Sequence, residues 1–190
     1  MGDVRYGVVL GGGRSSRMGT DKLELVLDGQ TLLQRTVAAA LSCCHRVVVA
    51  SPTRIGFDDP RVAFVLENPP FGGPAAGLAA AVAQLPREAA ELLLLAGDLA
   101  NPAATVAALL GGELGPDGLV LVDAEGWPQH LAGRYRLDAV RGALSGRESW
   151  RDQSLRRALR ALNLARKTVP KSVTADLDTP ENARKYGVIG

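Results

Sequence analysis

What this 190-residue sequence lacks excludes several classes of protein. Aromatic residues make up 4% of it and the formal net charge is +2, which disfavours a dedicated nucleic-acid-binding module. No stretch approaches the roughly 18 continuous apolar residues that a membrane span requires. The charged segment from Met1 to Arg5 does not resemble a signal peptide. We therefore expect a soluble, cytoplasmic protein.

Cysteine is also scarce, with only Cys43 and Cys44 present. Adjacent cysteines rarely pair with each other, so a disulfide framework is not expected. We interpret both as reduced, partly buried small residues that follow a helix.

Two common phosphate-binding motifs are missing as well. A P-loop needs a Gly-Lys pair, and the chain contains none. A dinucleotide fingerprint that starts at Gly11 and Gly13 would need a third glycine where Ser16 stands. Neither type of site is present.

The hydrophobic content of 46% is enough for one compact domain, which we expect to span residues 1–190. Alternating apolar patterns predict strands and helices in turn, so the fold class is α/β, three-layered and Rossmann-like, with a mostly parallel central sheet. The all-apolar run Leu92–Ala96 is typical of a central strand covered on both faces. The other expected strands are Tyr6–Leu10, Arg46–Ala50, Val62–Leu66, Gly118–Val122, Gln129–Tyr135 and Thr168–Ser172. The expected helices are Thr31–Ser42, Pro74–Leu85, Pro102–Leu110, Leu137–Leu144, Ser154–Leu162 and one at the C-terminus.

The first strand runs into a glycine-rich, basic loop. Residues Gly11, Gly12 and Gly13 lack Cβ atoms, so their backbone N–H groups can converge on an anion. Three cations follow within a dozen residues, namely Arg14, Arg17 and Lys22. This pattern favours a triphosphate site over a merely flexible surface loop.

The segment from Leu10 to Lys22 resembles the signature of the nucleotidyltransferases that build the dinucleotide form of the molybdenum cofactor, Leu-Ala-Gly-Gly-x-Ser-x-Arg-Met-Gly-x-Asp-Lys. Every fixed position is met except the second, where Gly11 replaces alanine. Gly12 and Asp21 resemble the guanylyl branch of the family more than the cytidylyl branch. Three further segments resemble family motifs in family order: Glu67–Leu78, Leu92–Asp98 and Asp176–Glu181.

The resemblance implies a nucleotidyltransferase fold and a Mg²⁺-dependent transfer of GMP from GTP to a molybdopterin-type acceptor, with release of pyrophosphate. It implies contacts with other molybdenum cofactor biosynthesis proteins and with molybdoenzymes, and none with nucleic acid or membrane. The implied catalytic residues are Arg17, Lys22 and Asp98. The implied nucleotide-binding residues are Leu10, Gly11, Gly12, Gly13, Lys22, Glu67, Asn68, Gly77 and Asp98, and the implied metal ligands are Asp98 and Asp178.

Asp98 has support from position alone, because ligands of open parallel sheets bind beyond the carboxyl ends of the strands. A carboxylate there suits Mg²⁺, which proteins bind through one or two carboxylates plus substrate phosphates. The competing interpretation is a helix N-cap, a role for which Asn101 is better placed. The role of Asp178, which Asp176 would assist, competes in the same way with capping of a terminal helix.

The sequence signals are weaker for the residues that bind the nucleotide base and the acceptor. Many relatives carry an asparagine just after the second strand, where this chain has Val49-Ala50-Ser51. Trp127 and His130 are candidates to flank a flat pterin, or they serve ordinary packing. A basic run either attracts an anionic acceptor or forms a solvated helix face; it comprises Arg156, Arg157, Arg160, Arg166, Lys167 and Lys171.

Two alternatives to a guanylyltransferase stay open. One is a cytidylyltransferase or another sugar or cofactor nucleotidyltransferase of the same fold. The other is a nucleotide-binding relative without turnover, which the presence of Lys22, Asp98 and Asp178 disfavours.

Overall fold

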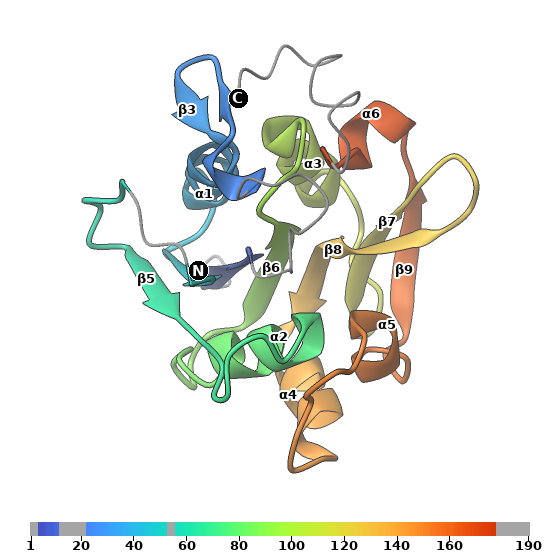
Figure 1. The fold of residues 1–190 in the computed structure, drawn as a ribbon. Helices are drawn as coiled ribbons and strands as arrows, with labels where there is room; N and C mark the ends of the chain where they lie inside the picture. The colour runs from blue at the N-terminus through green and yellow to red at the C-terminus, as the bar shows by residue number, and fades with distance from the viewer. Residues whose placement is uncertain (1–3, 12–21, 53–55, 178–190) are drawn as a thin grey trace.

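A seven-stranded sheet forms the centre of the computed structural model, which describes residues 4–11, 22–52 and 56–177 (Figure 1). The strands lie in the order β5-β4-β1-β6-β8-β7-β9. Their bounds are β1 Arg5–Leu10, β4 Arg46–Ala50, β5 Val62–Val65, β6 Glu91–Ala96, β7 Gly118–Val122, β8 Pro128–Arg136 and β9 Leu164–Thr168. All neighbouring pairs are parallel except the two that β8 makes with β6 and β7. The predicted α/β, mostly parallel fold is confirmed.

Helices cover both faces of this sheet and so complete the three layers (Figure 1). One face carries α1 Leu32–Leu41, α3 Pro102–Leu110 and α6 Lys171–Thr174. The other carries α2 Pro74–Val82, α4 Leu137–Ser145 and α5 Leu155–Ala158. Strand β6 explains why both faces need cover, because Leu92 and Leu94 enter one core while Leu93 and Leu95 enter the other. A short 3-10 helix, Lys22–Glu24, and a small ribbon of β2 Val26–Leu27 and β3 Gln30–Thr31 precede α1.

Local sequence signals set the starts of the helices. Thr31 caps α1 and forms a capping box with Gln34. Pro74 stands in the first turn of α2, as predicted, where a missing N–H costs nothing. Asn101 caps α3 by accepting a hydrogen bond from the Ala104 amide at 3.2 Å.

Two predictions in the last third of the chain were wrong. The expected strand Thr168–Ser172 is instead β9, Leu164–Thr168, which pairs with β7 and ends before Pro170, the residue that precedes α6. Proline lacks the N–H that a ladder requires. The expected helix Ser154–Leu162 is only the four residues of α5, because the chain must turn toward β9, where the Asn163 amide donates to Asp117. The expected C-terminal helix lies outside the described residues.

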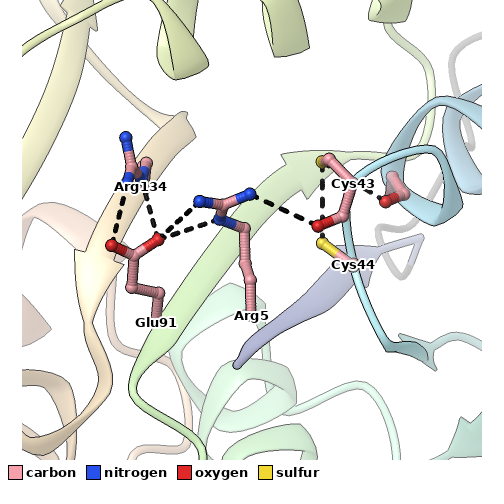
Figure 2. Close-up of polar contacts among 6 residues, drawn as sticks. Arg5, Cys43, Cys44, Glu91 and Arg134 are labelled. Atoms are coloured by element: carbon pink, nitrogen blue, oxygen red, sulfur yellow. Dashed lines mark hydrogen bonds and ion pairs between the residues drawn. The ribbon is translucent and has the colours of Figure 1, made fainter. Parts of the chain in front are cut away.

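A buried ion network joins three strands at the end of the sheet where β1 and β6 begin (Figure 2). The Glu91 carboxylate accepts from Arg5 at 2.9 Å and from Arg134 at 2.8 Å. Arg5 also donates to the Cys43 carbonyl at 3.3 Å. The thiols of Cys43 and Cys44 are free, as predicted, and their sulfurs are 3.9 Å apart. This network holds the sheet together at the end remote from the glycine-rich loop.

None of the helices that the structure describes is long and apolar enough to cross a membrane.

Candidate nucleotide site

The carboxyl ends of β4, β1 and β6 are tied together by backbone hydrogen bonds. The Gly11 amide donates to the Ala50 carbonyl, and the Gly97 amide donates to the Leu10 carbonyl, each at 3.0 Å. Leu10 is buried, and its backbone carbonyl is occupied by the hydrogen bond from Gly97. The strand end that precedes the glycine-rich loop is therefore rigidly positioned.

Close packing explains two of the glycines at this edge. A Cβ on Gly11 would lie 2.7 Å from Leu23 Cδ1, and a Cβ on Gly97 would lie 2.8 Å from Leu23 Cδ2. Leu23 is buried between them. The glycines thus let the chain after the loop return against the ends of β1 and β6, and Lys22, whose backbone begins the 3-10 helix, is the residue next to Leu23.

Two polar side chains that the sequence did not single out as site residues support the same edge. The Ser51 hydroxyl donates to the Gly11 carbonyl at 3.4 Å, and the Thr36 hydroxyl donates to the Gly97 carbonyl at 3.5 Å. Both residues are buried. The sequence signal for Thr36 is a polar residue on the apolar face of a helix, and for Ser51 it is a polar residue directly after an apolar strand. Buried polar groups at such places are expected to form hydrogen bonds.

Asp98 follows β6 and is half-buried at this edge. Its carbonyl accepts from the Leu177 amide at 3.2 Å, and the Ala100 amide donates to the Ala175 carbonyl at 2.9 Å. The structure therefore brings the segment around Asp176 beside Asp98, although the two lie far apart in the sequence. Since Asn101 caps α3, capping does not account for Asp98.

The second predicted loop is shaped by its own contacts. The Glu67 carboxylate accepts from the Gly72 amide at 3.1 Å, while Asn68 is exposed. Gly77 is buried in α2, where its amide donates to the Gly73 carbonyl and a Cβ would be 3.6 Å from Ala50. Glu67 thus holds the loop, and Gly77 lies where α2 packs against the strand ends.

Four predicted site residues, Gly12, Gly13, Arg17 and Asp178, lie outside the described residues, as does the side chain of Lys22. Leu10, Gly11, Asp98 and Gly77 share the edge formed by the ends of β1, β4 and β6.

Comparison with known proteins agrees with this geometry. The model of the MobA-like NTP transferase domain matches residues 7–167. The curated molybdenum cofactor guanylyltransferase of Xanthomonas euvesicatoria is 38% identical over 183 residues, which cover 92% of this chain and 90% of that protein. The chain belongs to the MobA-like NTP transferase family.

Solved structures share the fold of this NTP transferase. The Mycobacterium tuberculosis protein Rv0371c superimposes with a TM-score of 0.69 at 23% identity, covering 97% of each chain. A structure of the same protein in complex with manganese gives a TM-score of 0.66 at 20% identity, covering 98% of each chain. Molybdopterin-guanine dinucleotide biosynthesis protein A from Archaeoglobus fulgidus gives 0.63 at 17% identity, covering 95% of this chain and 96% of that one.

The donor set of this NTP transferase fits a hard divalent cation. Among the described residues, no group of three or more His, Cys, Asp or Glu side chains could hold a metal ion. Mg²⁺ does not need a site of three or more protein ligands, because one or two carboxylates, water and the substrate phosphates complete its coordination. Asp98, which follows β6, carries one carboxylate at this edge of the sheet.

Two cavities flank the hairpin between β7 and β8. The smaller, about 170 Å³, has the acidic residues Asp123, Glu125 and Asp176 together with Lys171 in its lining. The larger, about 580 Å³, brings Trp127 and His130 together with part of the basic run. Lys167 lies elsewhere, since its ammonium donates to the Ala108 carbonyl at the end of α3 at 2.9 Å.

Proposed function

We propose that this NTP transferase transfers GMP from GTP to a molybdopterin-type acceptor. The likeness to the Xanthomonas guanylyltransferase, which extends over nearly the whole chain, carries this proposal. The signature from Leu10 to Lys22, with Gly12 and Asp21 as in the guanylyl branch, supports it. We also propose a cytoplasmic location, and transfer of the product to molybdoenzymes with the help of other cofactor biosynthesis proteins.

The reaction is an in-line displacement at the α-phosphorus of GTP. An oxygen of the acceptor's phosphate forms a bond to that phosphorus, and the bond to the oxygen bridging to the β-phosphate breaks. The electron pair leaves with pyrophosphate, so negative charge grows on the leaving oxygens. Cations held in fixed positions stabilise this charge without reorganising.

In the proposed site, the backbone amides of Gly12 and Gly13 and the cations of Arg17 and Lys22 bind the triphosphate. Leu10 and Gly11 lie at the end of β1 beneath it, since the Gly11 amide already donates to the Ala50 carbonyl. Glu67 and Asn68 lie on the loop assigned to base and sugar. Gly77 lies in the first turns of α2, where this helix packs against the strand ends beside that loop.

We assign the metal to Asp98 with Asp178 as the second ligand. The Leu177 amide bonds the Asp98 carbonyl, and Asp178 is the next residue in the sequence, which supports the pairing. Bound Mg²⁺ would supply charge neutralisation for the leaving pyrophosphate and orient the phosphates.

A thermal-shift titration with GTP, CTP, ATP and UTP, each with and without Mg²⁺, tests the nucleotide. A ligand that binds only the folded state raises Tm, and at 100 times Kd it adds about 2.7 kcal/mol of stability. We expect a Mg²⁺-dependent shift for GTP alone. A shift for CTP instead would contradict the guanylyl assignment. This outcome is worth testing because the chain has Val49-Ala50-Ser51 where many relatives carry an asparagine.

Turnover separates an enzyme from a protein that only binds nucleotide. With GTP, Mg²⁺ and molybdopterin under anaerobic conditions, we expect pyrophosphate release. Lys22→Ala should lower kcat by about 10²- to 10³-fold, because it removes a charge aimed at the transition state. The matched control is Lys167→Ala, whose ammonium bonds the end of α3. Equal activity of the two variants would remove Lys22 from the mechanism.

A further inference from the structure

Cys43 and Cys44 form a pair of thiols in the turn between α1 and β4. Their sulfurs are 3.9 Å apart and face each other (Figure 2). On a regular helix or strand the side chains of adjacent residues point in different directions, so adjacent thiols there would not meet. This pair follows Leu41, the last residue of α1, and precedes Arg46, the first residue of β4. The turn therefore brings together two sulfurs that a regular element would separate.

Backbone contacts hold this turn in place. The amides of Cys43 and Cys44 both donate to the Ala40 carbonyl, at 3.2 and 2.9 Å. The Arg5 guanidinium donates to the Cys43 carbonyl at 3.3 Å, and in its neutral form the Cys43 thiol donates to the Ala40 carbonyl at 3.5 Å. The two sulfurs are thus presented in a fixed arrangement.

The two thiols differ in their access to solvent. Cys44 is 5% exposed and belongs to the core cluster that contains Ala40 and Val47, and a Cβ on Gly7 would lie 3.6 Å from its sulfur. Cys43 is only half-buried. A small reagent in solution therefore reaches Cys43 first, with Cys44 directly behind it.

The charge around the pair favours an anionic sulfur. Arg5 and Arg134 share the single carboxylate of Glu91, so this network keeps a net positive charge, and Figure 2 shows Arg5 on the side of the thiols. The hydrogen bond from Cys44 and the charge of Arg5 lower the pKa of Cys43 to about 6, although burial opposes them. Cys43 is then mostly thiolate at pH 7, and the thiolate is the nucleophile.

The same charge disfavours a metal ion at this place, because the Arg5 guanidinium would repel it. No group of three or more His, Cys, Asp or Glu side chains that could hold a metal occurs in the described part of the chain. The reagent that suits an accessible thiolate backed by a second thiol is a small, neutral oxidant.

We propose that Cys43 and Cys44 are a redox modification site, at which hydrogen peroxide or another small hydroperoxide converts the two thiols into a disulfide. The site lies at the end of the sheet remote from the glycine-rich loop, and the inference does not depend on the proposed function. Cys43 is the attacking residue and Cys44 the resolving one.

The reaction has two steps. The Cys43 thiolate attacks one oxygen of the peroxide, so a sulfur–oxygen bond forms and the oxygen–oxygen bond breaks. The sulfur is oxidised to a sulfenic acid, and the leaving hydroxide takes up a proton to become water. The Cys44 sulfur then attacks the Cys43 sulfur. The sulfur–sulfur bond forms, the sulfur–oxygen bond breaks, and the departing hydroxide leaves as water with the proton from the Cys44 thiol.

We expect this disulfide to be readily reversed. The Cα atoms of adjacent residues are about 3.8 Å apart across a trans peptide, which is shorter than the roughly 4.4 to 6.8 Å usual for a disulfide. Closing the gap between the sulfurs must therefore distort the turn that Ala40 and Arg5 hold. Strained disulfides are the ones that thiols reduce most easily.

Mass spectrometry of the full chain after peroxide treatment tests the product. Trypsin releases both cysteines in one peptide, Thr36–Arg46, and the chain has no other cysteine. Digested without reductant, this peptide should have lost the mass of two hydrogen atoms, both thiols should be missing from a titration under denaturing conditions, and dithiothreitol should restore them. A peptide that gains oxygen instead, or that is linked to a second chain, would overturn the proposal.

Two variants test the separate roles of the thiols. Cys44→Ser should stop at the sulfenic acid, which dimedone traps on Cys43. Cys43→Ser should remain unmodified over the same time, because its remaining thiol is shielded. The proposal is wrong if both variants react with peroxide at the same rate.

A matched pair of variants tests the cation. Arg5→Gln and Arg134→Gln each remove one partner of Glu91, but only Arg5 contacts Cys43. Arg5→Gln should slow the oxidation of Cys43 several-fold, while Arg134→Gln should keep the rate of the wild type. Urea midpoints measured alongside show that both variants are folded under the assay conditions. Equal slowing in the two variants would contradict the role of Arg5 beside the thiolate.

Discussion

At the scale of single residues, Gly97 and Gly77 both lie against Leu10 but differ in the room around them. A Cβ on Gly97 would lie 2.8 Å from Leu23 and 3.4 Å from the Leu10 carbonyl oxygen, whereas a Cβ on Gly77 would make only ordinary contacts of 3.6 Å or more. Gly97→Ala should therefore destabilise the protein by about 1 to 3 kcal/mol. Gly77→Ala should be neutral or stabilising by up to about 1 kcal/mol, because alanine is the better helix former.

Urea denaturation of the two variants measures this difference. GTP binding by each refolded variant then tells whether Leu23 and the adjoining Lys22 have moved. Equal midpoints for Gly97→Ala and Gly77→Ala would show that the close packing around Leu23 has no energetic consequence.

The thiol of Cys43 is the second residue-scale prediction. A hydrogen bond from Cys44 lowers the pKa of Cys43 to about 6, with help from the Arg5 charge and against the effect of burial. The same hydrogen bond and burial raise the pKa of Cys44. At pH 7 iodoacetamide should therefore alkylate Cys43 well before Cys44, since the thiolate is the nucleophile.

Peptide mass mapping over time, at several pH values, checks this order. Cys44→Ser should shift the midpoint of Cys43 alkylation, and Cys43→Ser should leave a nearly unreactive protein. A midpoint for Cys43 near 8.5, the value of an ordinary thiol, would contradict the role of its neighbour.

At the scale of elements, Glu91 joins β1, β6 and β8 through Arg5 and Arg134. The carboxylate is 2% exposed, so removing it leaves two cations without a partner in a mostly buried setting. Glu91→Ala should cost about 3 to 5 kcal/mol of unfolding free energy. Asp138→Ala, which breaks an exposed pair with Arg141, should cost about 0 to 1 kcal/mol. Chemical denaturation of both variants measures the contrast, and similar losses would contradict it.

An element could be predicted from the sequence where its pattern of apolar residues, or a capping residue at its start, defines it. Strand β6 was predictable because four leucines in a row leave no exposed face, and α3 because Asn101 and Pro102 mark its start. Strand β9 was not, since its residues are half-buried or exposed and its partner β7 supplies the order. Helix α5 was too short for apolar spacing to define its end.

At the scale of the whole molecule, the sequence could predict the edge that carries the candidate nucleotide site but not the larger cavity beside the β7–β8 hairpin. Gly11 and Asp98 follow β1 and β6, which are parallel neighbours in the sheet, so their positions after the strand ends bring them to the same edge. The cavity instead depends on β8 running antiparallel and on α5 ending early, which places Arg156 and Arg166 beside His130. The spacing of apolar residues in the sequence does not predict that α5, β8 and β9 lie side by side.

The dependence of stability on pH tests both ends of the sheet in one experiment. The pKa of His130 is lowered from its ordinary 6.5, chiefly by burial, so its contribution to stability is complete above pH 6.5 and is lost as the pH falls below that value. For Glu91, burial raises the pKa, but the hydrogen bonds from Arg134 and Arg5 outweigh burial and lower it below 4.5. Its contribution is present above about pH 4.5 and is lost as the pH falls through the lowered value.

We therefore expect the urea midpoint of the wild type to fall in two steps on acidification, the first beginning near pH 6.5 and the second below 4.5. His130→Gln should remove the first step, because glutamine does not titrate, and leave the second. Glu91→Gln should lower the midpoint at all pH values, keep the first step and reduce the second, to which Asp59 and Asp123 also contribute because their pKa values are lowered. A first step that persists in His130→Gln would mean that a group other than His130 controls stability in that range.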